Sequence, residues 1–308
     1  MTALVEVASY LPERRVPIEE LADDLGLTPM QVKVFRRYHK LGEVCRDDGA
    51  TVLDLLRRAV AGLETLPGQE HRVRYVLYAR TFPVVVPYPH NPVHELCREA
   101  GLAHAQAFTV THQACASGLL ALDIASRLLA ADEPGALALV LAGEKAFTGE
   151  TRLVPETSVF GEGASACLVA ADGPRDRMLS YTADLHGEFD GDSVDLALRY
   201  QQEYTDLLVG AVNGAVAGAG LKLDEIDLIL PHNVNVMAWQ RACRRLGVPL
   251  DRVLLEHVAS AGHVFCADAF VNYRTAADRG LLRPGGHYVV AAAGAARGAT
   301  FSAMVFEH

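Results

Sequence analysis

Thr111-His112-Gln113-Ala114-Cys115-Ala116-Ser117-Gly118 is a run of mostly small residues around one cysteine. It follows an extended run at 107–110 and precedes the segment 119–129, in which Ala and Leu recur at helical spacing. The pattern therefore predicts Cys115 where a strand passes into a buried helix. The free N–H groups and partial positive charge of a helix start favour a thiolate there. The alternative is a buried, unreactive cysteine, and this stretch alone does not decide between them.

The composition is that of a globular protein, with half of its 308 residues hydrophobic and a net charge of −10. This charge argues against nucleic acid or an anionic membrane as the main partner. No apolar run reaches membrane-spanning length, and charged residues come too early in the chain for a signal peptide. The six cysteines lack the spacing of a metal site or a disulfide framework. We therefore expect a cytoplasmic protein without a bound metal.

Apolar runs and turn residues divide the chain into alternating strands and helices. We expect strands at 2–10, 74–80, 107–110, 136–142, 164–169, 226–230, 288–292 and 300–306, and a linker at 172–177. We expect helices at 18–25, 30–40, 51–66, 93–100, 119–129, 204–217, 237–246 and 267–279. This alternation predicts the α/β class, with mostly parallel sheets between helices.

The two halves of the chain have the same order of elements. The strand around Val76 corresponds to the strand around Leu228, and the helix after Cys115 corresponds to the helix after Cys266. Such a long repeat indicates a duplicated fold rather than a solenoid. We predict one half at 1–171, which carries the cysteine, and a second at 172–308, with strand ends at a shared cleft.

Five segments in order resemble the thiolase superfamily, and within it the β-ketoacyl-ACP synthase III group. They are Ala8-Ser9-Tyr10-Leu11-Pro12, Ala114-Cys115-Ala116-Ser117-Gly118, Phe160-Gly161-Glu162-Gly163-Ala164, Pro231-His232-Asn233-Val234-Asn235 and the glycine-containing loop with the strand at 294–303. The resemblance covers nearly the whole chain. It implies the duplicated thiolase fold, with five layers α-β-α-β-α and two mixed sheets, and a homodimer.

The same resemblance implies roles for individual residues. Cys115 would accept the acyl group, and His232 would support the thiolate, hydrogen-bond the reacting carbonyl and transfer protons. Asn235 would hold the pantetheine arm, with a plain helix cap as the alternative. The oxyanion hole would consist of the Cys115 N–H and one near Ala296. The loss of such a donor typically costs about 3–4 kcal/mol in the activation barrier.

The chain departs from the family at its third catalytic position. Where the family carries Gly-Asn-Thr-Ser, the sequence reads Gly262-His263-Val264-Phe265. The expected set is therefore Cys115, His232 and His263. Elongating ketosynthases also use one cysteine and two histidines, so condensation remains open. However, an imidazole can accept a proton from an alcohol or amine, which an asparagine cannot. Family members altered at this position include enzymes that form esters or amides.

A second departure concerns the donor. The family's adenine-binding tryptophan is missing from 30–40, and the only tryptophan is Trp239. Met237 lies near the place of an expected arginine. We therefore expect acyl-phosphopantetheine on an acyl carrier protein, rather than acyl-CoA, as the donor, and no permanently bound cofactor. Glu144 and Lys145 read either as a surface ion pair or as part of the acceptor pocket.

The sequence thus predicts an acyltransferase of specialised metabolism. Cys115 would be loaded with an acyl group and would pass it to a hydroxyl or amine of a small-molecule acceptor. The alternatives are decarboxylative Claisen condensation with a malonyl-type thioester and a non-catalytic subunit of a heteromeric synthase. The identities of the acyl group and the acceptor are not readable from the residues.

Overall fold

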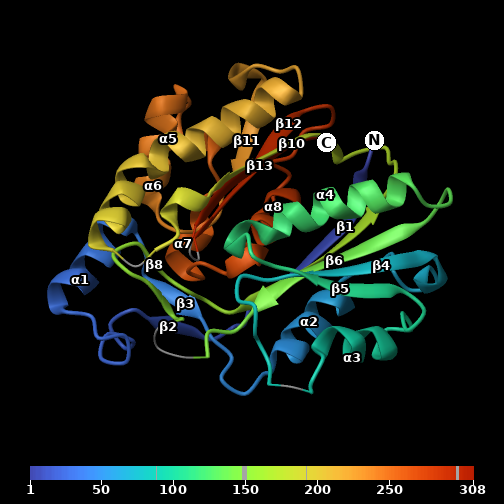
Figure 1. Ribbon diagram of the computed structural model, residues 1–308, viewed down its shortest axis with the longest axis horizontal. Coiled ribbons are helices and arrows are strands. Elements are labelled where there is room, and N and C mark those ends of the chain that lie inside the picture. The colour runs from blue at the N-terminus through green and yellow to red at the C-terminus, as the bar shows by residue number, and fades with distance from the viewer. Residues whose placement is uncertain (88, 148–150, 192, 296–297) are drawn as a thin grey trace.

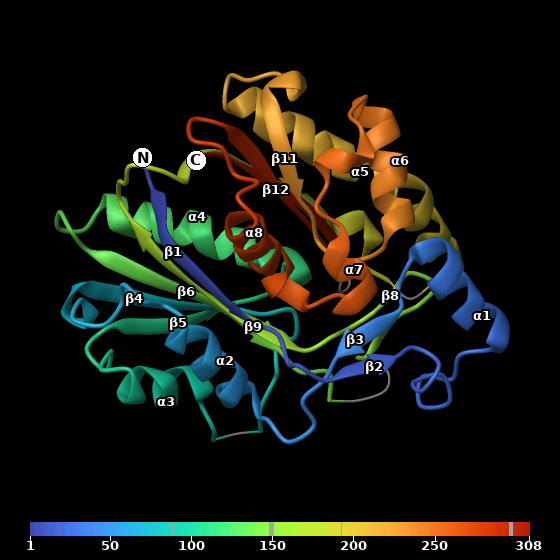
Figure 2. The same cartoon turned by 180° about the vertical axis from the view of Figure 1, so that it is seen from behind.

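The computed structural model describes residues 1–87, 89–147, 151–191, 193–295 and 298–308 (Figures 1 and 2). Its main feature is a nine-stranded mixed sheet in the order β11-β12-β13-β10-β1-β9-β6-β4-β5. These strands are β1 (Ala3–Tyr10), β4 (Val73–Ala79), β5 (Gln106–Val110), β6 (Leu137–Glu144), β9 (Gly163–Ala170), β10 (Arg177–His186), β11 (Ile226–Leu230), β12 (His287–Ala295) and β13 (Ala299–Glu307). Two short pairs are added, β2 (Arg15–Pro17) with β3 (Glu43–Cys45) and β7 (Leu153–Val154) with β8 (Ser158–Val159).

The nine strands form two groups that meet at a narrow join. Strands β1 and β10 share one register pair, Ala3 with Arg177. On one side the order is β1-β9-β6-β4-β5, and on the other it is β10-β13-β12-β11. The expected pair of mixed sheets is therefore present as two groups joined into one sheet. The order β1-β9-β6-β4 matches β10-β13-β12-β11 strand for strand, which is the arrangement expected of a duplicated chain.

Helices cover the sheet in layers (Figure 1). Helices α4 and α8 lie between the two strand groups, α2 and α3 cover the outer face of one group, and α5 and α6 cover the other. The helices are α1 (Pro29–Val34), α2 (Val52–Ala61), α3 (Pro92–Glu99), α4 (Ser117–Ala130), α5 (Val194–Gly218), α6 (Val236–Leu246), α7 (Glu256–Ser260) and α8 (Asp268–Asp278). The five-layer thiolase-like α/β fold predicted from the resemblance is thus confirmed.

The middle layer brings the two halves into contact. Leu119 of α4 and Phe270 of α8 share one buried cluster with Val140 of β6 and Met304 of β13. A Cβ at Gly118 would lie 2.8 Å from the carbonyl oxygen of Cys266. Only glycine permits this approach without a shift, so the starts of the two central helices pack directly against each other.

Several segments differ from the sequence-based expectation, among them the short elements β2, β3, β7, β8 and α7, which were not predicted. The prediction of a helix at 18–25 is wrong. The chain there forms a series of turns, which begins where the Ile18 N–H donates a hydrogen bond to the Gly42 carbonyl. The helix predicted at 30–40 is α1 followed by a π-helical turn, Phe35–His39. Strand β10 went unpredicted because none of its residues is fully buried and it therefore lacks an apolar run.

Candidate active site

Cys115 lies in a 3-10 turn, Ala114–Ala116, between β5 and α4. Ala114 has a φ of 46°, a left-handed conformation that is strained for a residue with a side chain. The same geometry recurs in the second half, where Phe265, with a φ of 52°, precedes Cys266 at the start of α8. The nucleophile turn predicted from the sequence therefore has a structural counterpart in the repeat.

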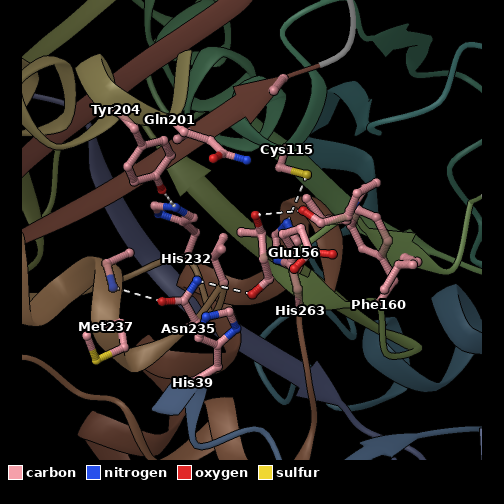
Figure 3. Close-up of a pocket in the computed structure, with 18 of the residues that line it drawn as sticks. His39, Cys115, Glu156, Phe160, Gln201, Tyr204, His232, Asn235, Met237 and His263 are labelled. Carbon is pink, nitrogen blue, oxygen red and sulfur yellow. Dashed lines mark hydrogen bonds between the residues drawn. The ribbon is translucent and has the colours of Figure 1, made fainter. Parts of the chain in front are cut away.

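His263 contacts the cysteine directly. Its Nε2 lies 3.1 Å from the Cys115 Sγ, as Figure 3 shows. The backbone of His263 is bridged to the β8–β9 connection, with its N–H donating to Val159 O at 3.0 Å and its carbonyl accepting from Gly161 N at 2.9 Å. Phe160 stacks on the imidazole with 4.9 Å between ring centroids. The ring is therefore fixed from two sides beside the sulfur.

Asp268 completes this arrangement, and sequence reasoning missed it. Its Oδ2 is hydrogen-bonded to Nδ1 of His263 and also accepts the Asn233 N–H at 2.6 Å. Its Oδ1 accepts the Val264 N–H at 2.6 Å, and the side chain is almost fully buried. The available signal was an acidic residue five positions after His263, in the first turn of the helix predicted at 267–279.

The surroundings of His263 favour its charged form. Burial lowers the pKa of the imidazole, but the Asp268 carboxylate and the Cys115 sulfur outweigh burial and hold it well above its ordinary value. A protonated His263 would in turn stabilise a thiolate on Cys115. The order Cys115, His263, Asp268 is that of a nucleophile, a base and a carboxylate that orients the base.

His232 lines the same cavity but has a different partner. Its Nε2 is hydrogen-bonded to the Tyr204 hydroxyl on α5 (Figure 3). Its carbonyl accepts the Trp239 indole N–H at 3.1 Å. The ring centroid lies 6.3 Å from that of His263. Burial, together with the charge of His263, lowers the pKa of His232 to about 3. His232 is therefore a neutral hydrogen-bonding group.

The other predicted site residues are placed as follows. Asn235 is the N-cap of α6, because its Oδ1 accepts the Ala238 N–H at 2.8 Å, and its Nδ2 donates to Thr157 O at 3.1 Å. It also lines the cavity, so its pantetheine role stays a prediction. Ala296 lies outside the described residues, and the oxyanion hole with the Cys115 N–H stays a prediction as well.

A cavity of about 700 Å³ opens onto the sulfur. Its wall near Cys115 is aromatic, because Phe82 and Phe160 line it. Phe160 stacks on Phe265 with centroids 4.2 Å apart, and Phe82 packs edge-on against both rings. Towards α1, α5 and α6 the lining becomes more polar, with His39, Glu156, Gln201, Asn235 and Arg241. This volume suits an extended ligand with an apolar end at the Cys115 sulfur.

Glu144 and Lys145 do not form the predicted surface ion pair. Both side chains are buried, and Lys145 pairs with Glu162 at 3.2 Å. Glu144 instead accepts the N–H groups of Thr81 and Phe82. The interpretation as a surface ion pair failed because the partners of Glu144 and Lys145 come from segments far apart in the sequence.

Metal-binding clusters and membrane-spanning helices are both absent from the described ranges. No cluster of His, Cys, Asp and Glu within them could hold a metal ion. Nor do they contain a helix long and apolar enough to cross a membrane.

Comparisons with known proteins agree on one family. Residues 216–308 match the model for 3-oxoacyl-[acyl-carrier-protein] synthase III, C terminal. A β-ketoacyl-[acyl-carrier-protein] synthase III from Nitratidesulfovibrio vulgaris is 28% identical over 84% of this chain and 83% of its own. The enzyme of that name from Roseobacter denitrificans is 26% identical, with 94% of each chain covered. The chain is thus similar to β-ketoacyl-[acyl-carrier-protein] synthase III proteins over most of its length, and its C-terminal part matches the model of that family.

Solved structures agree on the fold of this family. The synthase III from Aquifex aeolicus superposes with a TM-score of 0.85 at 18% identity, with both chains fully covered. ChlB3, described as an acyltransferase, superposes with a TM-score of 0.86 at 19% identity over 99% of this chain and 97% of its own. The sequence relatives and these two structures thus carry names of condensing or acyl-transferring enzymes.

Proposed function

We propose that the protein moves an acyl group from a phosphopantetheine thioester, by way of Cys115, to the hydroxyl or amine of a small acceptor. The observation that supports this proposal is the contact series Cys115–His263–Asp268. An imidazole whose far nitrogen is bound to a buried carboxylate is suited to accept and return a proton. The asparagine that the family has at this position could not do so.

In the loading step, the Cys115 thiolate attacks the carbonyl carbon of the donor thioester. A new bond between that carbon and Sγ forms, and the bond to the pantetheine sulfur breaks. The departing thiolate takes the proton from Nε2 of His263, which leaves a neutral imidazole whose orientation Asp268 maintains.

In the transfer step, the neutral His263 accepts the proton of the acceptor hydroxyl or amine. The acceptor oxygen or nitrogen attacks the acyl carbon, and the bond from this carbon to the Cys115 sulfur breaks. The sulfur leaves as a thiolate next to a newly protonated His263, so both residues return to their starting states. Neutral His232 remains available as a hydrogen-bonding group in the cavity.

An acyl carrier protein is the favoured donor. Arg241 lines the main cavity, and with Arg244 and Arg245 it also lines a second hollow of about 650 Å³ between α5 and α6. Guanidinium groups at this place suit a pantetheine phosphate and an acidic protein surface. Trp239 is fully buried against His232, so it offers no face for an adenine ring.

The cellular compartment and the oligomeric state are also proposals. The six cysteines are all unpaired and buried in the described structure, which suits a reducing compartment such as the cytoplasm. A homodimer is proposed from the family resemblance, and the sedimentation of the pure protein would test it.

Decarboxylative condensation is the second candidate. A neutral His232 could hydrogen-bond a developing enolate, which favours this reaction as well. In a third candidate, the non-catalytic subunit, Cys115 would receive no acyl group at all.

Mass spectrometry of the intact protein after incubation with acyl-carrier donors tests the proposal. We expect an acyl adduct on Cys115, absent from Cys115→Ala, and its discharge by hydroxyl or amine acceptors. Absence of the adduct in the wild type would reject both enzymatic candidates. Release of carbon dioxide from malonyl donors would favour condensation, and we expect His263→Asn to increase it if this residue alone redirects the chemistry.

Asp268→Asn tests the orienting carboxylate. We expect adduct formation to slow by roughly 10²- to 10⁴-fold, because the imidazole loses its charged partner. Asp278→Asn, at the exposed far end of α8, is the matched control, since it breaks only a surface pair with Arg274. Equal rates for the two variants would contradict the proposed role of Asp268.

A further inference from the structure

The Cys115 sulfur has a second close polar neighbour besides His263. The Thr81 hydroxyl donates to Sγ at 3.3 Å, and its side chain is buried at the wall of the cavity. Thr81 comes two residues after the end of β4, far from the cysteine in sequence. No motif marks it, yet it touches the reacting atom.

Glu144 holds this threonine in place. Its Oε2 accepts the Thr81 N–H at 2.6 Å, and its Oε1 accepts the Phe82 N–H at 2.8 Å. Strands β4 and β6 are parallel neighbours with Ala79 opposite Ala142. Thr81 and Glu144, each two positions further along, therefore lie at the same edge of the sheet. The two bonds fix the backbone that carries the Thr81 side chain.

A buried carboxylate is costly, so its presence needs a reason. Glu144 is completely buried, and burial raises its pKa to about 7 although the two N–H groups oppose this. An apolar side chain would avoid that cost but would leave both N–H groups without these acceptors. The arrangement suits a carboxylate that positions 81–82.

The Thr81 hydroxyl has two sulfur atoms within reach. Its oxygen lies 3.3 Å from the Cys115 Sγ and 3.5 Å from the Cys266 Sγ, while the Cys266 thiol donates to Ala114 O at 3.3 Å. A hydroxyl has a single hydrogen, and a thiolate is a better acceptor than a thiol. Between the two sulfurs the hydrogen is therefore directed to Cys115 when that sulfur is ionised, and the Glu144 carboxylate, which also interacts with the Thr81 side chain, is the remaining competitor for it.

We propose that Thr81 is a catalytic residue that donates a hydrogen bond to the Cys115 thiolate, and that Glu144 is the residue that positions it. This inference rests on the proposed function, in which that thiolate attacks the donor and leaves again after transfer. With His263 on one side and Thr81 on another, two donors stabilise the same sulfur each time its negative charge returns.

Alkylation of Cys115 by iodoacetamide, followed by peptide mass spectrometry from pH 5 to 9, tests the inference. We expect Thr81→Val to raise the midpoint of the pH profile by about one unit and to slow alkylation below it about tenfold. Thr81→Ser keeps the hydroxyl and should stay within about twofold of the wild type. A Thr81→Val profile equal to that of the wild type, or a Thr81→Ser profile equal to that of Thr81→Val, would overturn it.

Glu144→Gln tests the positioning role separately. An amide can accept only one of the two N–H groups well, so we expect the midpoint to move in the direction seen for Thr81→Val. Glu162→Gln is the matched control, because Glu162 is also buried and accepts the Asp47 N–H but has no link to Thr81. Equal shifts in the two glutamine variants would reject the positioning role. Because alkylation needs no acyl donor, these results are independent of whether acyl-Cys115 forms.

Discussion

His232 and His263 lie in one cavity with opposite charge preferences. His263 faces a carboxylate and a sulfur, both of which favour its protonated form. His232 is buried beside Tyr204 and Trp239 and faces the positive charge of His263. The two imidazoles are therefore suited to different roles, because His263 can carry a proton while His232 remains a neutral hydrogen-bonding group.

The neutral state of His232 predicts sensitivity to acid. The unfolded chain binds a proton on this residue near pH 6.5, whereas the folded chain resists protonation down to about pH 3. Because the unfolded state binds more protons in that window, stability falls as the pH falls. We expect this group to lower the free energy of unfolding by about 2 kcal/mol between pH 7 and pH 5.

Urea unfolding of the wild type and His232→Gln at both pH values measures this effect. Glutamine keeps a polar side chain but does not titrate, so the variant should lose about 2 kcal/mol less than the wild type on acidification. The same loss in both proteins would mean that His232 does not titrate as its surroundings indicate.

At the scale of elements, the conformation of the turn that carries Cys115, Ala114–Ala116, depends on its packing against β12. The end of β12 approaches the turn so closely that a Cβ at Gly294 would lie 2.0 Å from the carbonyl oxygen of Gln113. That atom belongs to the backbone just before Ala114, so relief requires the turn itself to move. The glycine of the predicted C-terminal loop is thus a packing requirement.

Gly294→Ala should therefore destabilise the protein and disturb the site together. We expect a loss of about 3 kcal/mol or more in the free energy of unfolding, together with slower alkylation of Cys115. Gly210→Ala on α5 is the matched control, because a Cβ there meets nothing within 4 Å. It should stabilise the protein by about 0.5–1 kcal/mol, since alanine favours the helix. Similar changes in the two variants would contradict the argument.

For the whole molecule, the buried middle layer opposes separate unfolding of the two halves. The predicted division at 171/172 falls in the segment 171–176, where the chain passes between the two strand groups. However, one apolar cluster contains residues of both halves, including Leu119 and Phe270. Neither half can leave the other without exposing that cluster to water.

We therefore expect a single cooperative unfolding transition. Trp239 is the only tryptophan and lies in the second half, so its fluorescence follows that half, while far-ultraviolet circular dichroism follows the whole chain. The two urea curves should coincide. A fluorescence midpoint separated from the circular dichroism midpoint would show that the halves unfold independently.

The sequence by itself predicted most strands and helices, and its resemblance to a known family predicted that Cys115, His232 and His263 meet, as they do in lining one cavity. These features are local in origin, because apolar periodicity, turn residues and short motifs are written in consecutive positions. By contrast, the helix predicted at 18–25 is wrong and β10 was missed. Contacts with neighbouring segments, rather than their own residue patterns, determine the conformations of these two segments.

Only the tertiary structure decided which polar groups meet at the sulfur. Asp268 binds His263, Tyr204 binds His232, and Glu144 holds Thr81 against Cys115. Tyr204 and Thr81 lie 28 and 34 positions from the residues they contact, and Asp268 gains its role only when the start of α8 turns towards the cavity. Hydrogen bonds act over about 3 Å in space and leave no periodic trace along a chain. Cys115 could thus be proposed as the nucleophile from sequence, whereas the groups that surround its sulfur required the fold.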